Sequence, residues 1–126
     1  MSWISRTIAS DSKALDRLRR AFVREPTQEG LHRVRTGARR LRSFLEDVAQ
    51  RHRQKQLLGR AKRTAELTDI ARDAAVQRAL LERLLDESER DAAEALLASL
   101  RERETVATAS ARRKLKGVRY KTGGSA

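Results

Sequence analysis

The stretch from Leu31 to Glu46, LHRVRTGARRLRSFLE, decides the fold of this chain. Its apolar residues recur at alternating spacings of 3 and 4, which is the period of an amphipathic helix with one side against a core. Just before it, Thr27 is a suitable N-cap residue and Glu29 places an acid in the first turn. We therefore predict a helix through about Ala49 whose core positions are Leu31, Val34, Ala38, Leu41, Leu45 and Val48.

Three other segments have a helical period. The first covers about 4–23, the next about 57–85 and the last about 91–115, with a turn expected in 51–56, where apolar residues are absent. Amphipathic helices joined by short connections pack against one another as bundles. The sequence thus predicts an all-α protein, an antiparallel four-helix bundle.

The composition agrees with a helical chain and narrows its chemistry. The 126 residues include a single proline and no cysteine, so disulfides, a nucleophilic thiol and thiolate metal sites are excluded. The beginning, MSWISRTIAS, lacks the apolar run of a signal peptide, and no stretch approaches the ~20 apolar residues of a membrane span. We expect a cytoplasmic protein without a membrane partner, with one domain over 1–121 and a flexible tail over 122–126.

The net charge of +12 is unevenly distributed. Residues 31–63 contain eleven basic and two acidic residues, whereas residues 64–111 contain six basic and eleven acidic ones. A solvated surface would mix its signs more evenly. The imbalance indicates an anionic partner for the basic part of the chain.

A row of cations follows the second helix beside its apolar stripe. His32, Arg35, Arg39 and Arg42 are spaced 3, 4 and 3, so they lie within about 80° of one another along about 15 Å of helix. Arg40 extends the charge around the outer side. Guanidinium groups remain charged and match pairs of phosphate oxygens, so the row is suited to a polyanion. The alternative is a solvated face whose arginines pair with acids of the third and fourth helices.

Two further features leave more than one interpretation open. Arg72 occupies the middle of the expected apolar stripe of the third helix, so it either contacts a ligand or pairs with Glu104 or Asp73. The cations near the end of the chain either extend the binding surface or belong to a solvated terminus: Arg112, Arg113, Lys114, Lys116, Arg119 and Lys121.

Enzyme signatures are missing from the sequence. It contains no GxxxxGK[ST], GxSxG or HExxH motif, and its two histidines, His32 and His52, are twenty positions apart. We expect no catalytic residues, no cofactor and no metal site. Beside three arginines, His32 is expected to stay neutral until a phosphate arrives and then to become a further donor.

Two motifs resemble those of the CHAD family, the conserved-histidine α-helical domain. LHRVRTGARRLRSFLE matches the pattern H-x-x-R-x-x-x-R-R-L-R, and TDIARDAAVQ resembles the arginine-aspartate motif that places Arg72, Asp73 and Val76. A weaker similarity continues to LKGVRY. Departures are the pair Asp69-Ile70, where small residues or proline are common, and Gly37, which costs about 1 kcal/mol relative to alanine inside a helix.

The resemblance implies a helical domain that binds inorganic polyphosphate, locates to polyphosphate granules and catalyses no reaction. Members usually contain two four-helix halves related by a pseudo-twofold axis, and this chain supplies one. A homodimer that restores the second half is therefore expected. The polyphosphate-binding residues would be His32, Arg35, Arg39, Arg40, Arg42 and Arg72.

Two other classes of function are considered. A nucleic-acid-binding protein would also have a pI near 11.4, although only four aromatic residues are available, which argues against base stacking. A helical adaptor would place the same basic row against an acidic protein partner.

Overall fold

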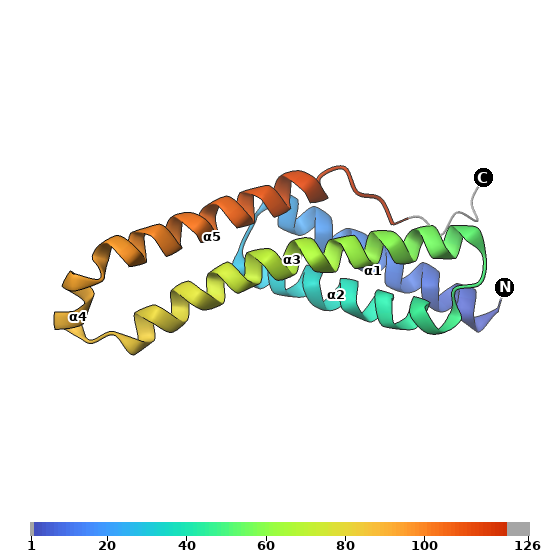
Figure 1. Cartoon of the computed structure of the whole chain (residues 1–126). Coiled ribbons are helices and arrows are strands. Elements are labelled where there is room, and N and C mark those ends of the chain that lie inside the picture. The colour runs from blue at the N-terminus through green and yellow to red at the C-terminus, as the bar shows by residue number, and fades with distance from the viewer. Residues whose placement is uncertain (1, 121–126) are drawn as a thin grey trace.

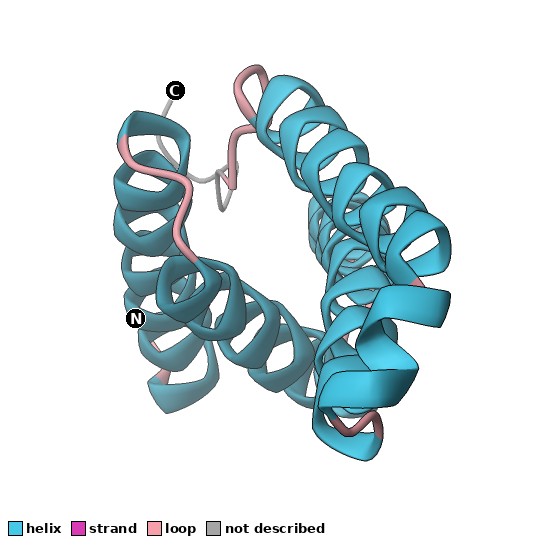
Figure 2. Cartoon of the chain, turned by 90° about the vertical axis from the view of Figure 1, so that its left-hand side faces the viewer, coloured by secondary structure: helices cyan, strands magenta, loops and turns pink. Residues whose placement is uncertain are grey.

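The computed structural model describes residues 2–120, so the tail expected over 122–126 lies outside the described residues. Within this range the chain forms five helices and no strand, with the connections at the helix ends (Figure 2). They are α1 (Trp3–Arg24), α2 (Gln28–Val48), α3 (His52–Leu84), α4 (Glu87–Ala92) and α5 (Glu94–Leu115). The prediction of an all-α protein is confirmed.

The helix starts follow from local capping. The Thr27 side chain accepts a hydrogen bond from the Gly30 amide at 2.9 Å, as expected for the start of α2. The turn before α3 is shorter than predicted, because the Gln54 side chain accepts bonds from the Gln50 and Arg51 amides and lets the helix begin at His52. The last predicted helix is divided in two. Asp86 caps α4, and the chain leaves helical geometry at Ala93 before α5 begins.

The core lies where α1 and α2 pack on the first half of α3. Its largest fully buried side chains are mostly leucines, together with Phe22 and Val34. Gly37 allows the close approach of α1 to α2, because a Cβ at this position would lie 3.2 Å from Leu15 Cδ1 and 3.3 Å from Leu18 Cδ1. The cost of a glycine inside α2 is thus offset by closer packing. All six predicted core positions of α2 are buried or partly buried.

The regular bundle predicted from the sequence is not confirmed. With 33 residues, α3 is about 50 Å long, whereas α1 and α2 have 22 and 21 residues and cover only about 33 Å. The outer half of α3 therefore projects beyond α1 and α2 and packs against α5, with α4 at the far tip (Figure 1). We call this projecting pair, residues 70–106, the arm.

The buried stripe of α3 also differs from the predicted one. It consists of Leu57, Ala61, Thr64, Ala65, Thr68, Ala71 and Ala74. Beyond Thr68 it turns from α1 and α2 towards α5, because only α5 accompanies α3 in the arm. Arg72 is consequently exposed and does not lie within an apolar stripe, contrary to the prediction.

Candidate functional site

The cations of α2 form one solvent-facing surface, which we call the α2 basic face. His32, Arg33, Arg39 and Arg40 are exposed, while Arg35 and Arg42 are partly buried at the side of α2 that faces α3. The leucines on the opposite side of α2 are buried in the core. The helix therefore holds these cations along one rigid element, as the spacing predicts.

Three arginines of the α2 basic face hold carboxylates of the chain itself. Arg35 Nε lies 2.6 Å from Asp69 Oδ1 on α3, Arg42 Nε lies 2.9 Å from Glu46 Oε1, and Arg33 Nη2 lies 2.7 Å from Glu29 Oε1. The hydrogen bond from Arg42 lowers the pKa of Glu46 below its ordinary value, so this carboxylate is charged at neutral pH. Any anion that binds here competes with these acids.

The other cations of this face have no such partner. Within residues 2–120, the side chains of His32, Arg39 and Arg40 form neither a hydrogen bond nor an ion pair. The positive charge of the α2 basic face is thus partly neutralised by carboxylates of the chain. The neutralisation is greater than the sequence indicated, but it is not complete. An interpretation in which the acids of α3 and α5 saturate the row does not fit, because Asp69 is the one acid of α3 or α5 paired with it in the described residues.

Arg72 lies on α3, about one turn beyond Asp69. The contact of Arg35 with Asp69 fixes the register of the antiparallel helices α2 and α3. A residue one turn after Asp69 on α3 therefore lies at the same level as a residue one turn before Arg35 on α2. This register places Arg72 level with His32. Arg72 makes no ion pair or hydrogen bond in the described part of the chain.

The predicted partner of Arg72 is used elsewhere. Glu104 binds Arg78, with 2.6 Å between Arg78 Nε and Glu104 Oε2, and also accepts a hydrogen bond from Gln28. Arg78 donates to Glu82 as well, and Glu82 in turn binds Arg101. Hydrogen bonding to Glu104 raises the pKa of Arg78 despite partial burial. The network joins α2, α3 and α5 at the base of the arm. The alternative in which Arg72 pairs with Glu104 or Asp73 is therefore not found among the described residues.

Sequence reasoning missed Asp69 as a partner of the basic row, and it placed the C-terminal cations only loosely. Helical spacing alone could have found the pairs of Arg33 with Glu29 and Arg42 with Glu46, which are four residues apart. The pair of Arg35 with Asp69 requires the register of two helices. Of the C-terminal cations, Lys121 lies outside the described residues. Arg112 donates to the Val23 carbonyl, so the end of α5 lies against α1.

Among the described residues, no group of three or more histidine, cysteine or acidic side chains could hold a metal ion, and no helix has the length and apolarity needed to cross a membrane. A family model, the CHAD domain, matches residues 7–123. The chain belongs to the CHAD family. The match includes both α2 and the arm, and it confirms the resemblance carried by the two motifs.

The CHAD family relates in general to polyphosphate binding, and its domain is a binding domain, not a catalytic one. Comparison of this CHAD chain with curated proteins and with solved structures gives no match.

Proposed function

We propose that the chain binds inorganic polyphosphate along the α2 basic face, through His32, Arg35, Arg39, Arg40, Arg42 and Arg72. The observation that carries the proposal is that Arg39 and Arg40 on α2 and Arg72 on α3 have no partner within residues 2–120, beside the exchangeable pairs of Arg35 and Arg42. In a cell, such binding would concentrate the protein at polyphosphate granules of the cytoplasm.

The geometry of the face suits a linear anion better than a compact one. From His32 to Arg42 the row extends about 15 Å along a helix that is open to solvent at both ends. A polyphosphate chain offers a charged oxygen pair at each unit, so successive units meet successive guanidinium groups in forked contacts. Solvent-screened ion pairs such as Arg42 with Glu46 contribute little to stability, so a phosphate oxygen can replace the carboxylate.

Asp69 is expected to weaken polyphosphate binding, because its carboxylate must leave Arg35 before a phosphate can take its place. Asp69→Asn should therefore raise the affinity for long-chain polyphosphate about 5-fold, the equivalent of one partly exposed ion pair. Calorimetric titration at fixed salt measures the change. Asp91→Asn, an exposed acid of α4, changes the net charge equally and serves as the control. Equal gains in both variants would contradict a specific role for Asp69.

Non-specific nucleic-acid binding is the main alternative. Among the described residues few aromatic side chains are available for stacking on bases. Phe22 and Tyr120 are buried, and the exposed Trp3 packs edge-on against Phe44 of α2 with 6.1 Å between ring centroids. This one pair limits the number of bases that could stack. Long-chain polyphosphate should displace duplex DNA at equal phosphate far more effectively than the reverse. The opposite order would favour the nucleic-acid function, and saturable one-to-one binding to an acidic protein would favour the adaptor.

We also propose that two copies of the chain form a homodimer through their arms. Large apolar side chains are exposed on the arm, among them Val76, Leu80, Leu84 and Leu96, with Leu84 at 66% exposure. Between residues 70 and 106 the sequence has nine acidic and six basic residues, while the remainder is strongly basic. A twofold arrangement would cover the leucines and bring the acidic arm of each copy near the basic part of the other.

The mass in solution is expected to be twice the chain mass of 14.3 kDa. Leu84→Glu should shift this mass to that of a monomer, because it places a charge in the apolar contact. Gln56→Glu adds the same charge at an exposed polar position of α3 outside the arm and should leave the dimer intact. Light scattering after size exclusion, with and without polyphosphate, provides the measurement. A wild-type monomer under both conditions would contradict the homodimer.

A further inference from the structure

The exposed apolar residues of the arm form a stripe on each of its two helices. On α3, Ile70 and Leu84 are 14 residues apart, so they lie within about 40° of each other around the helix. On α5, Leu96 and Val106 lie within about 80° of each other by the same measure. All four side chains are more than half exposed, with values from 53% to 66%. Each helix of the arm therefore presents one apolar stripe to solvent.

A groove at the base of the arm shows that the two stripes lie on the same side. Its volume is about 480 Å³, and its apolar lining comes from Leu67 and Ile70 of α3 together with Val106, Ala107 and Ala111 of α5. Ile70 and Val106, one from each stripe, thus face the same hollow. We call the side that carries both stripes and this groove the outer face of the arm.

The two ends of the outer face carry opposite charge. The tip of the arm, residues 85–96, contains five acidic residues and one arginine, and the exposed leucines of the two stripes lie beside it. At the base, the groove is lined by two cations, Arg103 and Lys114, and by a single acid, Glu102. Neither cation has a partner within residues 2–120. An apolar, acidic tip and an apolar, basic groove are complementary surfaces.

A single chain cannot bring the tip onto its own groove. Ile70 and Leu84 belong to one continuous helix, which holds them about 21 Å apart along its axis. A second copy of the chain provides the same tip and the same groove at the same spacing. If the two arms run antiparallel, a twofold axis across the middle of the arm places each tip on the groove of the other copy.

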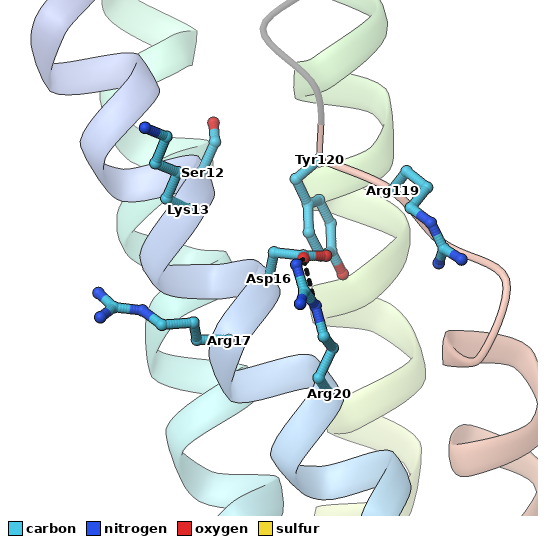
Figure 3. A pocket seen from close by; sticks show the side chains of 7 residues that line it. All are labelled: Ser12, Lys13, Asp16, Arg17, Arg20, Arg119 and Tyr120. Atoms are coloured by element: carbon cyan, nitrogen blue, oxygen red, sulfur yellow. Dashed lines mark hydrogen bonds and ion pairs between the residues drawn. The ribbon is translucent and has the colours of Figure 1, made fainter.

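A larger hollow on the body of the protein lacks this complementarity. It lies between α1 and the segment after α5, its volume is about 710 Å³, and all of the fully exposed residues that line it are charged. Figure 3 shows Lys13 and Arg17 directed away from Tyr120, and Arg20 held by Asp16. A leucine docked there would be surrounded by charged groups, whereas the groove of the outer face offers apolar side chains from two helices.

We propose that two copies of the chain pair through their outer faces in antiparallel orientation, with Leu84 and Leu96 of each copy against the groove of the other. This contact rests on the homodimer proposed above, and it specifies which surfaces meet. From Leu67 to Glu87 the face is about 30 Å long, and two helices side by side are about 20 Å wide. Pairing would thus bury about 600 Å² on each copy, near the lower limit for a stable interface. A contact between the tips alone would bury far less.

Cross-linking tests the antiparallel contact directly, because the chain has no native cysteine. Leu84→Cys and Ile70→Cys are mixed, allowed to exchange subunits and treated with a bismaleimide that has a short spacer. The mixture should form a covalent dimer, because residue 84 of one copy lies over residue 70 of the other. Leu84→Cys alone should lose this product, since its two cysteines would be about 21 Å apart. Leu84→Cys mixed with Ser43→Cys, at an exposed position of α2, is the control and should give no covalent dimer.

Light scattering on the same samples distinguishes failure of this contact from failure of the homodimer. A dimer mass without a covalent product from the mixture, or with one from Leu84→Cys alone, would overturn the antiparallel contact and leave the homodimer standing. A monomer mass for the wild type would overturn the homodimer and this contact together. Polyphosphate binding is measured separately, by calorimetric titration, so its failure is not confused with either result.

The charge at the groove provides a second test that leaves the apolar contact intact. Lys114→Glu should raise the dissociation constant of the dimer about 5-fold, because it sets a carboxylate opposite the acidic tip. Lys55→Glu makes the same change at an exposed position of α3 outside the arm and should change the constant less than about 2-fold. Sedimentation equilibrium measures both constants. Equal values for the two variants would contradict a contact between the acidic tip and the groove.

Discussion

Replacing Arg35 and Arg39 together by alanine should lower the affinity for long-chain polyphosphate about 100-fold. Each guanidinium is expected to contribute about 1.4 kcal/mol to the binding free energy through charge-assisted contacts to phosphate. A loss of about 1.4 kcal/mol raises the dissociation constant about tenfold. The salt dependence of binding should also become shallower, because fewer phosphates are neutralised and fewer counterions are released. Calorimetric titrations at several salt concentrations measure both effects.

Two comparisons make this result specific. Arg101→Ala/Arg103→Ala removes the same charge from the arm, and like the test variant it breaks one ion pair between helices, that of Arg101 with Glu82. It should reduce affinity only slightly. Arg39→Ala/Arg40→Ala removes exposed side chains that have no partner in the part of the chain that the structure describes, and it should weaken binding without any loss of helix content in circular dichroism. Full affinity in both α2 variants would show that polyphosphate binds elsewhere.

Arg19→Ala should destabilise the fold by about 3 kcal/mol, the range expected when one partner of a buried ion pair is removed. Arg19 is 4% exposed and links Asp16 on α1 to the carbonyls of Leu115 and Lys116 at the end of α5. Without it, those carbonyls and part of the charge of Asp16 lose their partner in a buried region. Urea unfolding followed by circular dichroism gives the free energy of unfolding.

The matched control for Arg19→Ala is Arg17→Ala, an exposed arginine two residues away on the same helix, which should change the free energy of unfolding by about 0.5 kcal/mol or less. Arg19→Met keeps much of the side-chain volume but not the donors, and it should fall between the two. If Arg19→Ala unfolded at the same urea concentration as the wild type, the buried contact would not hold α5 to α1.

Some of the fold was predictable because local signals and tertiary contacts agree. In α2 the Thr27 cap, the spacing of the leucines and valine and the observed burial are consistent, so the helix and its basic face follow from the sequence. In α1 the hydrophobic pattern and the observed burial disagree. The buried positions of α1 include Ser12 and Arg19, which a hydrophobic pattern does not predict to be buried, and Leu18 is only partly buried. The burial of Arg19 depends on partners almost a hundred residues away, the carbonyls of Leu115 and Lys116.

The arm shows why the rest could not be read from sequence. The buried side of α3 changes at Thr68 because α1 and α2 end there as neighbours and α5 takes their place. The hydrophobic period of α3 alone does not show where this change of neighbour occurs. The register between α2 and α3 decides that Asp69 meets Arg35. The register between α3 and α5 decides that Glu104 meets Arg78 and not Arg72. Candidate ligands could thus be found on one helix by spacing, whereas the acids that compete for them could not.

The central claim is that polyphosphate lies along α2, and arginine side-chain NMR tests it most directly. Polyphosphate of medium length is added to the labelled protein while the Nε resonances of its arginines are followed. Those of Arg35, Arg39 and Arg42 are expected to shift or broaden at lower polyphosphate concentration than those of Arg101 and Arg103 on the arm. Simultaneous changes in all five, or changes in the arm first, would contradict a binding surface on α2.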